Sequence, residues 1–296
     1  MMIPYFGETA ALLTAMIWAF AVILFKKSGE TVHPIALNLF KDMLGAALIL
    51  PTLYLLGGTL FHPAPVNEYL ILLASGALGI GISDTLFFRS LNLLGAGLSA
   101  IVDCLYSPFI IALSMIWLGE RMTILQVVGV LMIISAVFTA TFERNHKTLT
   151  RRNLILGILF GVLAMATMAV GVVMVKPILN RSPLLWVTEI RLLGGLLMLA
   201  VILLLHSDRR AILASAAVSK GWKYMLSGSI LGAYFSLILW LAGMKYTSAS
   251  IAAALNQTSN IFVFLFAALI LKEVINLQRV IGIILGVVGV FVVMFG

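Results

Sequence analysis

The chain is a succession of long apolar runs separated by short polar links. A helix that crosses a bilayer needs roughly 20 apolar residues, because each residue adds about 1.5 Å and the hydrocarbon core is about 30 Å thick. The runs are continuously apolar and do not alternate between apolar and polar positions, which excludes a transmembrane β-barrel. The pattern predicts an all-α integral membrane protein with ten transmembrane helices, near residues 8–26, 34–56, 68–88, 96–118, 123–142, 153–175, 184–205, 223–243, 249–271 and 277–295.

Composition favours a lipid environment for the chain. Of its 296 residues, 62% are hydrophobic and only 10% are charged, and the mean hydropathy is +1.15. Soluble globular domains carry about 25% charged residues, so a chain this apolar cannot cover a water-facing surface. The net charge of +8 lies mostly in the short links. Basic residues there set topology and contact lipid headgroups, so nucleic acid is not an expected partner.

The second half of the chain repeats the first. When the sequence is shifted by 153 positions, residues from about 75 to 141 align without a gap, and near the start the offset becomes 150. Polar and glycine matches carry the repeat: Gly79 with Gly232, Ser83 with Ser236, Asp103 with Asn256, Glu120 with Glu273, Gly129 with Gly282 and, at the shorter offset, Lys41 with Arg191. Five helices in each half is an odd number, so the second copy enters the membrane inverted. The sequence therefore predicts two inverted five-helix repeats, 1–147 and 148–296, an architecture that recurs in secondary transporters.

Several short motifs carry a resemblance to a known family. The fourth run ends Trp117-Leu-Gly-Glu-Arg121, the ninth ends Leu271-Lys-Glu-Val274, and the passage into the ninth reads Lys245-Tyr-Thr-Ser-Ala-Ser-Ile-Ala-Ala. With a basic residue in both second helices, the chain resembles the EamA branch of the drug/metabolite transporter superfamily. In the second half, Lys272 and Val274 stand where that family usually has Gly and Arg around the Glu. The resemblance implies an exporter of amino acids or other metabolites, with relatives that carry drugs, sugar phosphates or lipid-linked precursors.

Polar residues inside the spans are the candidates for function. A charged side chain at the centre of a span costs roughly 2.5–3.5 kcal/mol on insertion scales, so it usually faces a cavity or a partner. Asp103 shares a helical face with Ser99, Tyr106 and Ser107. It is either a carboxylate that binds an amine or exchanges a proton, or a structural hydrogen-bonding group. Its repeat mate Asn256 suits a neutral polar solute or an amino acid, or else joins two helices.

One cation lies inside the second helix of each half, Lys41 in the first and Arg191 in the second. Lys41 and Arg191 either capture a substrate carboxylate or act as structural partners of Asp42, Glu189 or Asp103, because a buried charge demands pairing.

The aromatic residues of the spans either line a path or lie at the membrane interface, and Met165, Met168 and Met174 are interpreted as core filler. The candidate substrate-binding or gating residues are Asp103, Asn256, Lys41, Arg191, Asn38, Tyr106, Asn260, Trp18, Trp186 and Trp240. The candidate proton- or ion-coupling residues are Asp103, Asp84, Glu189 and Asp42.

Catalytic patterns are absent from the sequence. It contains no phosphate loop, no Gly-x-Ser-x-Gly elbow and no His pair at metal spacing, so we expect neither an enzyme nor a cofactor or metal. The expected partners are a small-molecule substrate, the lipid bilayer and the proton as a candidate coupling ion, for a monomer or homodimer. The expected location is the cell (plasma or inner) membrane, which the chain crosses many times.

The orientation in the membrane stays open. The links on the side away from the termini carry 12 Lys and Arg residues, against 4 on the side of the termini. The positive-inside rule then places both termini outside, whereas the family resemblance implies termini in the cytoplasm.

The leading hypothesis for function is a secondary active transporter. It would export small metabolites, most of all amino acids or related compounds, by alternating access around a central cavity lined by helices 1–4 and 6–9. Two alternatives stay open: a proton-coupled exporter of lipophilic cations or drugs, and a non-transporting membrane protein such as a lipid-modifying enzyme or an assembly factor.

Overall fold

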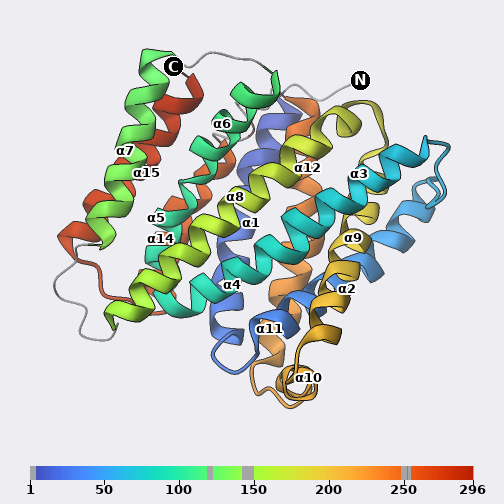
Figure 1. The fold of residues 1–296 in the computed structure, drawn as a ribbon, viewed down its shortest axis with the longest axis horizontal. Helices are drawn as coiled ribbons and strands as arrows, with labels where there is room; N and C mark the ends of the chain where they lie inside the picture. Colours follow the sequence, from blue (N-terminus) through green and yellow to red (C-terminus); the bar gives the residue numbers. More distant parts are fainter. Residues whose placement is uncertain (1–4, 119–122, 142–149, 248–251, 253–254, 296) are drawn as a thin grey trace.

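A computed structural model describes residues 5–118, 123–141, 150–247, 252 and 255–295, and in these residues every regular element is a helix (Figure 1). Among the motifs noted above, Gly119–Arg121, much of the passage after Lys245 and the predicted repeat boundary at 147/148 lie outside the described residues. The elements are α1 Phe6–Ser28, α2 Pro34–Leu55, α3 Val66–Gly76, η1 Ala77–Ile82, α4 Ser83–Leu94, α5 Ala96–Asp103, α6 Tyr106–Leu118, α7 Ile124–Thr141, α8 Arg151–Arg181, α9 Leu184–Leu205, α10 Arg209–Ala217, α11 Trp222–Ser229, η2 Ile230–Ser236, α12 Leu237–Tyr246, α14 Ser259–Ile270 and α15 Leu277–Phe295.

The protein is a multi-pass membrane protein. Within the described residues, seven helical stretches are long and apolar enough to cross a bilayer: Phe6–Ser28, Pro34–Leu55, Val66–Leu94, Ala96–Leu113, Arg151–Arg181, Leu184–Leu205 and Trp222–Tyr246. Three shorter apolar helices, Ile124–Thr139, Leu255–Ile270 and Leu277–Val293, overlap the remaining predicted runs. Large apolar side chains such as Leu131, Leu159 and Leu197 are exposed on the outer surface. Such a surface is stable only against acyl chains.

Two of the long stretches are interrupted by a π-helix. The turn η1 lies between α3 and α4, and η2 lies between α11 and α12. Their first residues, Ala77 and Ile230, are 153 positions apart, which is the offset of the sequence repeat. A π-helix leaves backbone carbonyls poorly paired and is frequent at functional sites. Here the Asn38 amide of α2 fills part of that deficit, because its Nδ2 donates to the carbonyl oxygens of Ile80 (3.0 Å) and Gly81 (3.2 Å).

Glycines bring α3 and α9 into very close contact. A Cβ added to Gly76 would lie 1.8 Å from the carbonyl oxygen of Arg191, and one added to Gly194 would lie 2.2 Å from that of Leu73. Only a residue without a side chain fits at such a crossing. The contact fixes the height and rotation of α9, and with them the position of Arg191.

At one end of the molecule, hydrogen bonds join helix ends both within the first half of the chain and across the two halves. This is the end that holds α10, opposite the end where α1 begins and α15 ends (Figure 1). The carboxylate of Glu273 accepts hydrogen bonds from the backbone N–H groups of Ala96 (2.8 Å) and Gly97 (3.0 Å), so it caps α5. Lys272, which replaces the Gly usual in the EamA family, lies at φ +55, a left-handed conformation that glycine adopts without strain. Nearby, Lys26 donates to the carbonyl oxygen of Asn92 (3.1 Å).

Candidate functional site

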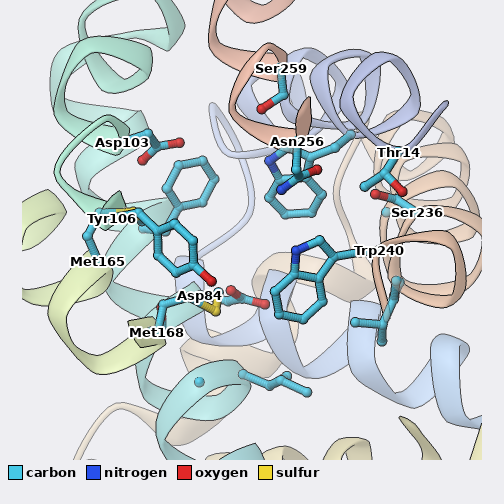
Figure 2. Close-up of a pocket in the computed structure, with 18 of the residues that line it drawn as sticks. Thr14, Asp84, Asp103, Tyr106, Met165, Met168, Ser236, Trp240, Asn256 and Ser259 are labelled. Atoms are coloured by element: carbon cyan, nitrogen blue, oxygen red, sulfur yellow. The ribbon is translucent and has the colours of Figure 1, made fainter. Parts of the chain in front are cut away.

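A cavity of about 140 Å³ lies in the centre of the bundle, and part of its lining is shown in Figure 2. Its walls come from α1, α2, the α3–η1–α4 stretch, α5 with α6, α8, α9, the η2–α12 stretch, and α14 with the residues just before it. The lining residues are Thr14, Trp18, Lys41, Gly79, Ile80, Ser83, Asp84, Phe87, Asp103, Tyr106, Met165, Met168, Arg191, Gly232, Ala233, Ser236, Leu237, Trp240, Asn256, Gln257, Ser259 and Asn260.

Lys41 is neutralised by two carboxylates. Its Nζ lies 2.5 Å from Oδ1 of Asp42 and 2.8 Å from Oδ2 of Asp84, and all three residues are buried. Asp84 reaches the lysine from the third span, while Asp42 is the next residue of α2. A buried ammonium needs partners of this kind. Lys41 thus has the pairing that a structural role requires, and it also lines the cavity.

Arg191 has no ionic partner in the described part of the chain. Its Nε donates to Oγ of Ser75 (3.0 Å), and Ser75 in turn donates to the carbonyl oxygen of Gly171 (2.7 Å). The guanidinium carbon lies 5.7 Å from the centroid of the Trp240 ring, in a cation–π contact. The side chain is buried, and neither Nη1 nor Nη2 has a hydrogen-bond partner. Arg191 therefore presents to the cavity a guanidinium whose Nη1 and Nη2 have no hydrogen-bond partner among the described residues.

Asp103 faces the same cavity from the end of α5, as Figure 2 shows. The described residues give it neither an ion pair nor a hydrogen bond. The Tyr106 hydroxyl and Oδ1 of Asn256, which also belong to the lining, are buried without a partner. Buried polar groups are nearly always hydrogen-bonded. Unpartnered polar atoms around one cavity indicate that water or a solute completes them.

The structure brings most of the predicted site residues together. Those that line the cavity are Asp103, Asn256, Lys41, Arg191, Tyr106, Asn260, Trp18, Trp240 and Asp84. Four lie outside its lining: Asn38, Trp186, Asp42 and Glu189. Asn38 stabilises the η1–α4 junction and also donates to Oγ1 of Thr85 (3.1 Å). Glu189 is buried on α9, with its Oε2 unpartnered.

Trp186 belongs to the packing beneath the α2–α3 loop. Its Nε1 donates to the carbonyl oxygen of Leu60 (3.0 Å), and its ring packs on His62 and Tyr69 at centroid distances of 5.0 and 5.1 Å. We expect Trp186→Phe to lower the free energy of unfolding by roughly 1–3 kcal/mol, because the Leu60 carbonyl loses its donor. Thermal unfolding in detergent measures this loss. The apparent KM for solute should not change, whereas a Trp that lines the path would change it.

Other lining residues were not chosen from the sequence. Met165 and Met168, interpreted there as core filler, lie against the cavity near Tyr106 (Figure 2). The sequence repeat, at its offset of 153 positions, could have predicted much of the lining. Seven lining residues of the first half have a counterpart 153 positions later that also lines the cavity: Gly79 and Gly232, Ile80 and Ala233, Ser83 and Ser236, Asp84 and Leu237, Phe87 and Trp240, Asp103 and Asn256, Tyr106 and Ser259.

Comparison with known proteins gives a consistent result. An uncharacterized transporter of Archaeoglobus fulgidus is 22% identical over 287 residues, which is 96% of each chain. An uncharacterized transporter of Methanothermobacter thermautotrophicus is 26% identical over 228 residues, covering 76% of this chain and 64% of the relative. A solved crystal structure shares the fold, with a TM-score of 0.69 and 17% identity over 97% of this chain and 95% of its own. The EamA-like transporter family matches residues 5–142 and 155–295. The protein thus belongs to the EamA-like transporter family.

Proposed function

We propose that this protein is a secondary active transporter that moves small metabolites out of the cell through the central cavity by alternating access. The observation that carries the proposal is the cavity itself. It is lined from eight helical stretches of a membrane protein, and its unpartnered polar atoms need a solute or water. Amino acids and related compounds are the leading substrates. The outward direction and the location in the plasma or inner membrane rest on the resemblance to the family.

We also propose that the ten apolar stretches all cross the membrane, as two inverted five-helix repeats, 1–147 and 148–296. Three observations support this arrangement. The π-helices begin at equivalent positions of the two halves, and the lining residues fall into pairs at the same offset. The two family matches, 5–142 and 155–295, correspond to the two halves. Inverted repeats allow both gates of an alternating-access transporter to be built from equivalent parts.

Glu273 supplies a gate at the end that holds α10. Its carboxylate joins the segment after α14 to the first turn of α5. We propose that these hydrogen bonds break when the cavity opens to this side. We expect Glu273→Gln to weaken the cap by roughly 1 kcal/mol, because the neutral amide loses its charge interaction with the helix N-terminus. An equilibrium shift of this size raises the open population about fivefold.

Cysteine labelling measures this shift. The probe is Ser236→Cys, at a buried serine of η2 that lines the cavity. The native Cys104 is buried and gives a low background. We expect maleimide to label residue 236 about fivefold faster in Glu273→Gln. Glu30→Gln, an exposed change at the same end, is the matched control and should leave the rate unchanged. Equal rates in the two variants contradict a gating role for Glu273.

A second candidate function is a proton-coupled exporter of lipophilic cations. One observation favours it: around the cavity, Asp84, Asp103 and the adjoining Asp42 outnumber the two cations Lys41 and Arg191. The aromatic walls formed by Trp18, Phe87 and Trp240 suit an apolar cation. In this case Asp103 exchanges a proton for the drug, and Asp103→Asn abolishes both drug export and its dependence on pH.

Counterflow in vesicles that hold only this protein tests the proposal. The labelled panel contains amino acids, a quaternary ammonium cation and sugar phosphates, each with and without an imposed proton gradient. Amino-acid flux supports the proposal that the protein transports amino acids. The response of that flux to the proton gradient identifies proton coupling. Flux of the cation alone supports the second candidate. No flux from folded protein contradicts transport of these solutes and favours a lipid substrate or a non-transporting protein.

A further inference from the structure

Four side chains with formal charges line the cavity, and two of them satisfy each other. They are Lys41, Asp84, Asp103 and Arg191. Lys41 and Asp84 form an ion pair that Asp42 completes. One cation, Arg191, and one carboxylate, Asp103, are left without an ionic partner in the part of the chain that the structure describes. The cavity therefore holds one guanidinium and one carboxyl group that lack an ionic partner among the described residues.

The guanidinium group of Arg191 is held in a fixed geometry. Its Nε is anchored by Ser75, and its guanidinium is held near the face of Trp240. Nη1 and Nη2 remain without partners although the residue is only 1% exposed. A guanidinium fork matches a carboxylate through two parallel hydrogen bonds, and it is more weakly hydrated than an ammonium. Its missing partner is an anion, and a planar carboxylate fits it best.

The carboxyl group of Asp103 has neutral polar neighbours in the lining besides Asp84. Tyr106 begins the next helix, and Asn256 is the repeat counterpart of Asp103; both direct their polar ends toward the cavity (Figure 2). An ammonium group has three donors and no acceptor. A carboxylate, an amide oxygen and a hydroxyl oxygen are acceptors that suit such a group. The rest of the wall is apolar, with Trp18, Phe87, Met165 and Leu237.

We infer that the cavity binds its solute as a zwitterion, with the solute carboxylate on Arg191, its ammonium on Asp103, and an apolar side chain against the aromatic wall. This inference rests on the proposed transport function and names its substrate class: α-amino acids with apolar or aromatic side chains. A simple amine leaves Arg191 unpaired and a simple carboxylic acid leaves Asp103 unpaired. A zwitterion satisfies both charges and brings no net charge into the membrane.

Competition binding tests the assignment. The probe is labelled L-phenylalanine, bound to purified protein in detergent and also followed in vesicle counterflow. The competitors are phenethylamine, which lacks the carboxylate, and 3-phenylpropanoate, which lacks the ammonium. We expect phenylalanine to bind about a hundredfold more tightly than either analogue, since each analogue leaves one buried charge of the protein unpaired. Equal binding of an analogue and phenylalanine overturns the inference.

Variants assign each charge to its end of the solute. In Arg191→Gln, phenylalanine should lose its advantage over phenethylamine, and in Asp103→Asn it should lose its advantage over 3-phenylpropanoate. Arg191→Lys and Asp103→Glu keep the charge and should restore part of the selectivity, which separates binding from folding. Asp208→Asn and Arg210→Gln change exposed residues and serve as matched controls. If both site variants weaken all three ligands equally, the two-point assignment is wrong.

The two readouts separate this inference from the transport proposal. Selective binding of phenylalanine without counterflow supports the zwitterion site and contradicts transport. Counterflow of panel solutes without selectivity for the zwitterion supports transport and overturns the site assignment. Neither binding nor counterflow, in protein that is monodisperse and unfolds cooperatively, overturns both.

Discussion

Lys41→Met should destabilise the protein by about 3–5 kcal/mol, the usual effect of removing one partner of a buried ion pair. Lys41 is the ionic partner of both Asp42 and Asp84, which are 0% and 6% exposed. Without the ammonium, two neighbouring carboxylates remain buried with no hydrogen-bonded counter-charge among the described residues. Unfolding in detergent, followed by intrinsic fluorescence, measures the loss.

Neutralising the two carboxylates that lost their partner should restore the stability of the protein. In the triple variant Lys41→Met, Asp42→Asn, Asp84→Asn no charge remains in the cluster, and neutral replacements of buried ion pairs are often tolerated. We therefore expect most of the lost stability to return. Lys223→Met, at an exposed position, is the matched control and should have little effect. A triple variant as unstable as the single variant shows that the loss has another cause, such as the packing of the lysine stem.

Gly76→Ala should disrupt the crossing of α3 and α9. The new methyl group lies 1.8 Å from the carbonyl oxygen of Arg191, a backbone atom that cannot turn away. Overpacking costs typically 1–3 kcal/mol and more where backbones must separate. Because Arg191 lies at the crossing, we expect loss of solute binding together with a lower midpoint of thermal unfolding.

Gly221→Ala is the control for this prediction. There the added Cβ meets Oγ1 of Thr31 at 3.2 Å and Oγ of Ser219 at 3.3 Å, which are side-chain atoms that can rotate. We expect normal binding and a small change in stability. Wild-type binding by Gly76→Ala contradicts the view that this crossing positions Arg191.

The sequence was informative about the site where the repeat could be used. It predicted Asp103 and Asn256 as a pair, and both line the cavity. It could not place Asn38 or Trp186, because helical periodicity gives the face of a residue but not the element that covers that face. Asn38 contacts η1, and no residue pattern indicates that a π-helix lies there. The sequence also placed Ser99 and Ser107 on one helical face with Asp103, whereas α5 ends at Asp103 and both serines are buried outside the lining.

The sequence by itself determined the membrane class, the all-helical architecture, the positions of the apolar stretches and the family. These follow from hydropathy and local motifs, because the free energy of placing a helix in lipid is close to a sum over its residues. Only the tertiary structure decided which charges are paired. From the sequence, Lys41 and Arg191 were interpreted as equivalents. Within the part of the chain that the structure describes, Lys41 has two carboxylate partners and Arg191 has none. Pairing depends on the distance between atoms on different helices, and that distance is set by glycine crossings and caps such as Gly76 and Glu273.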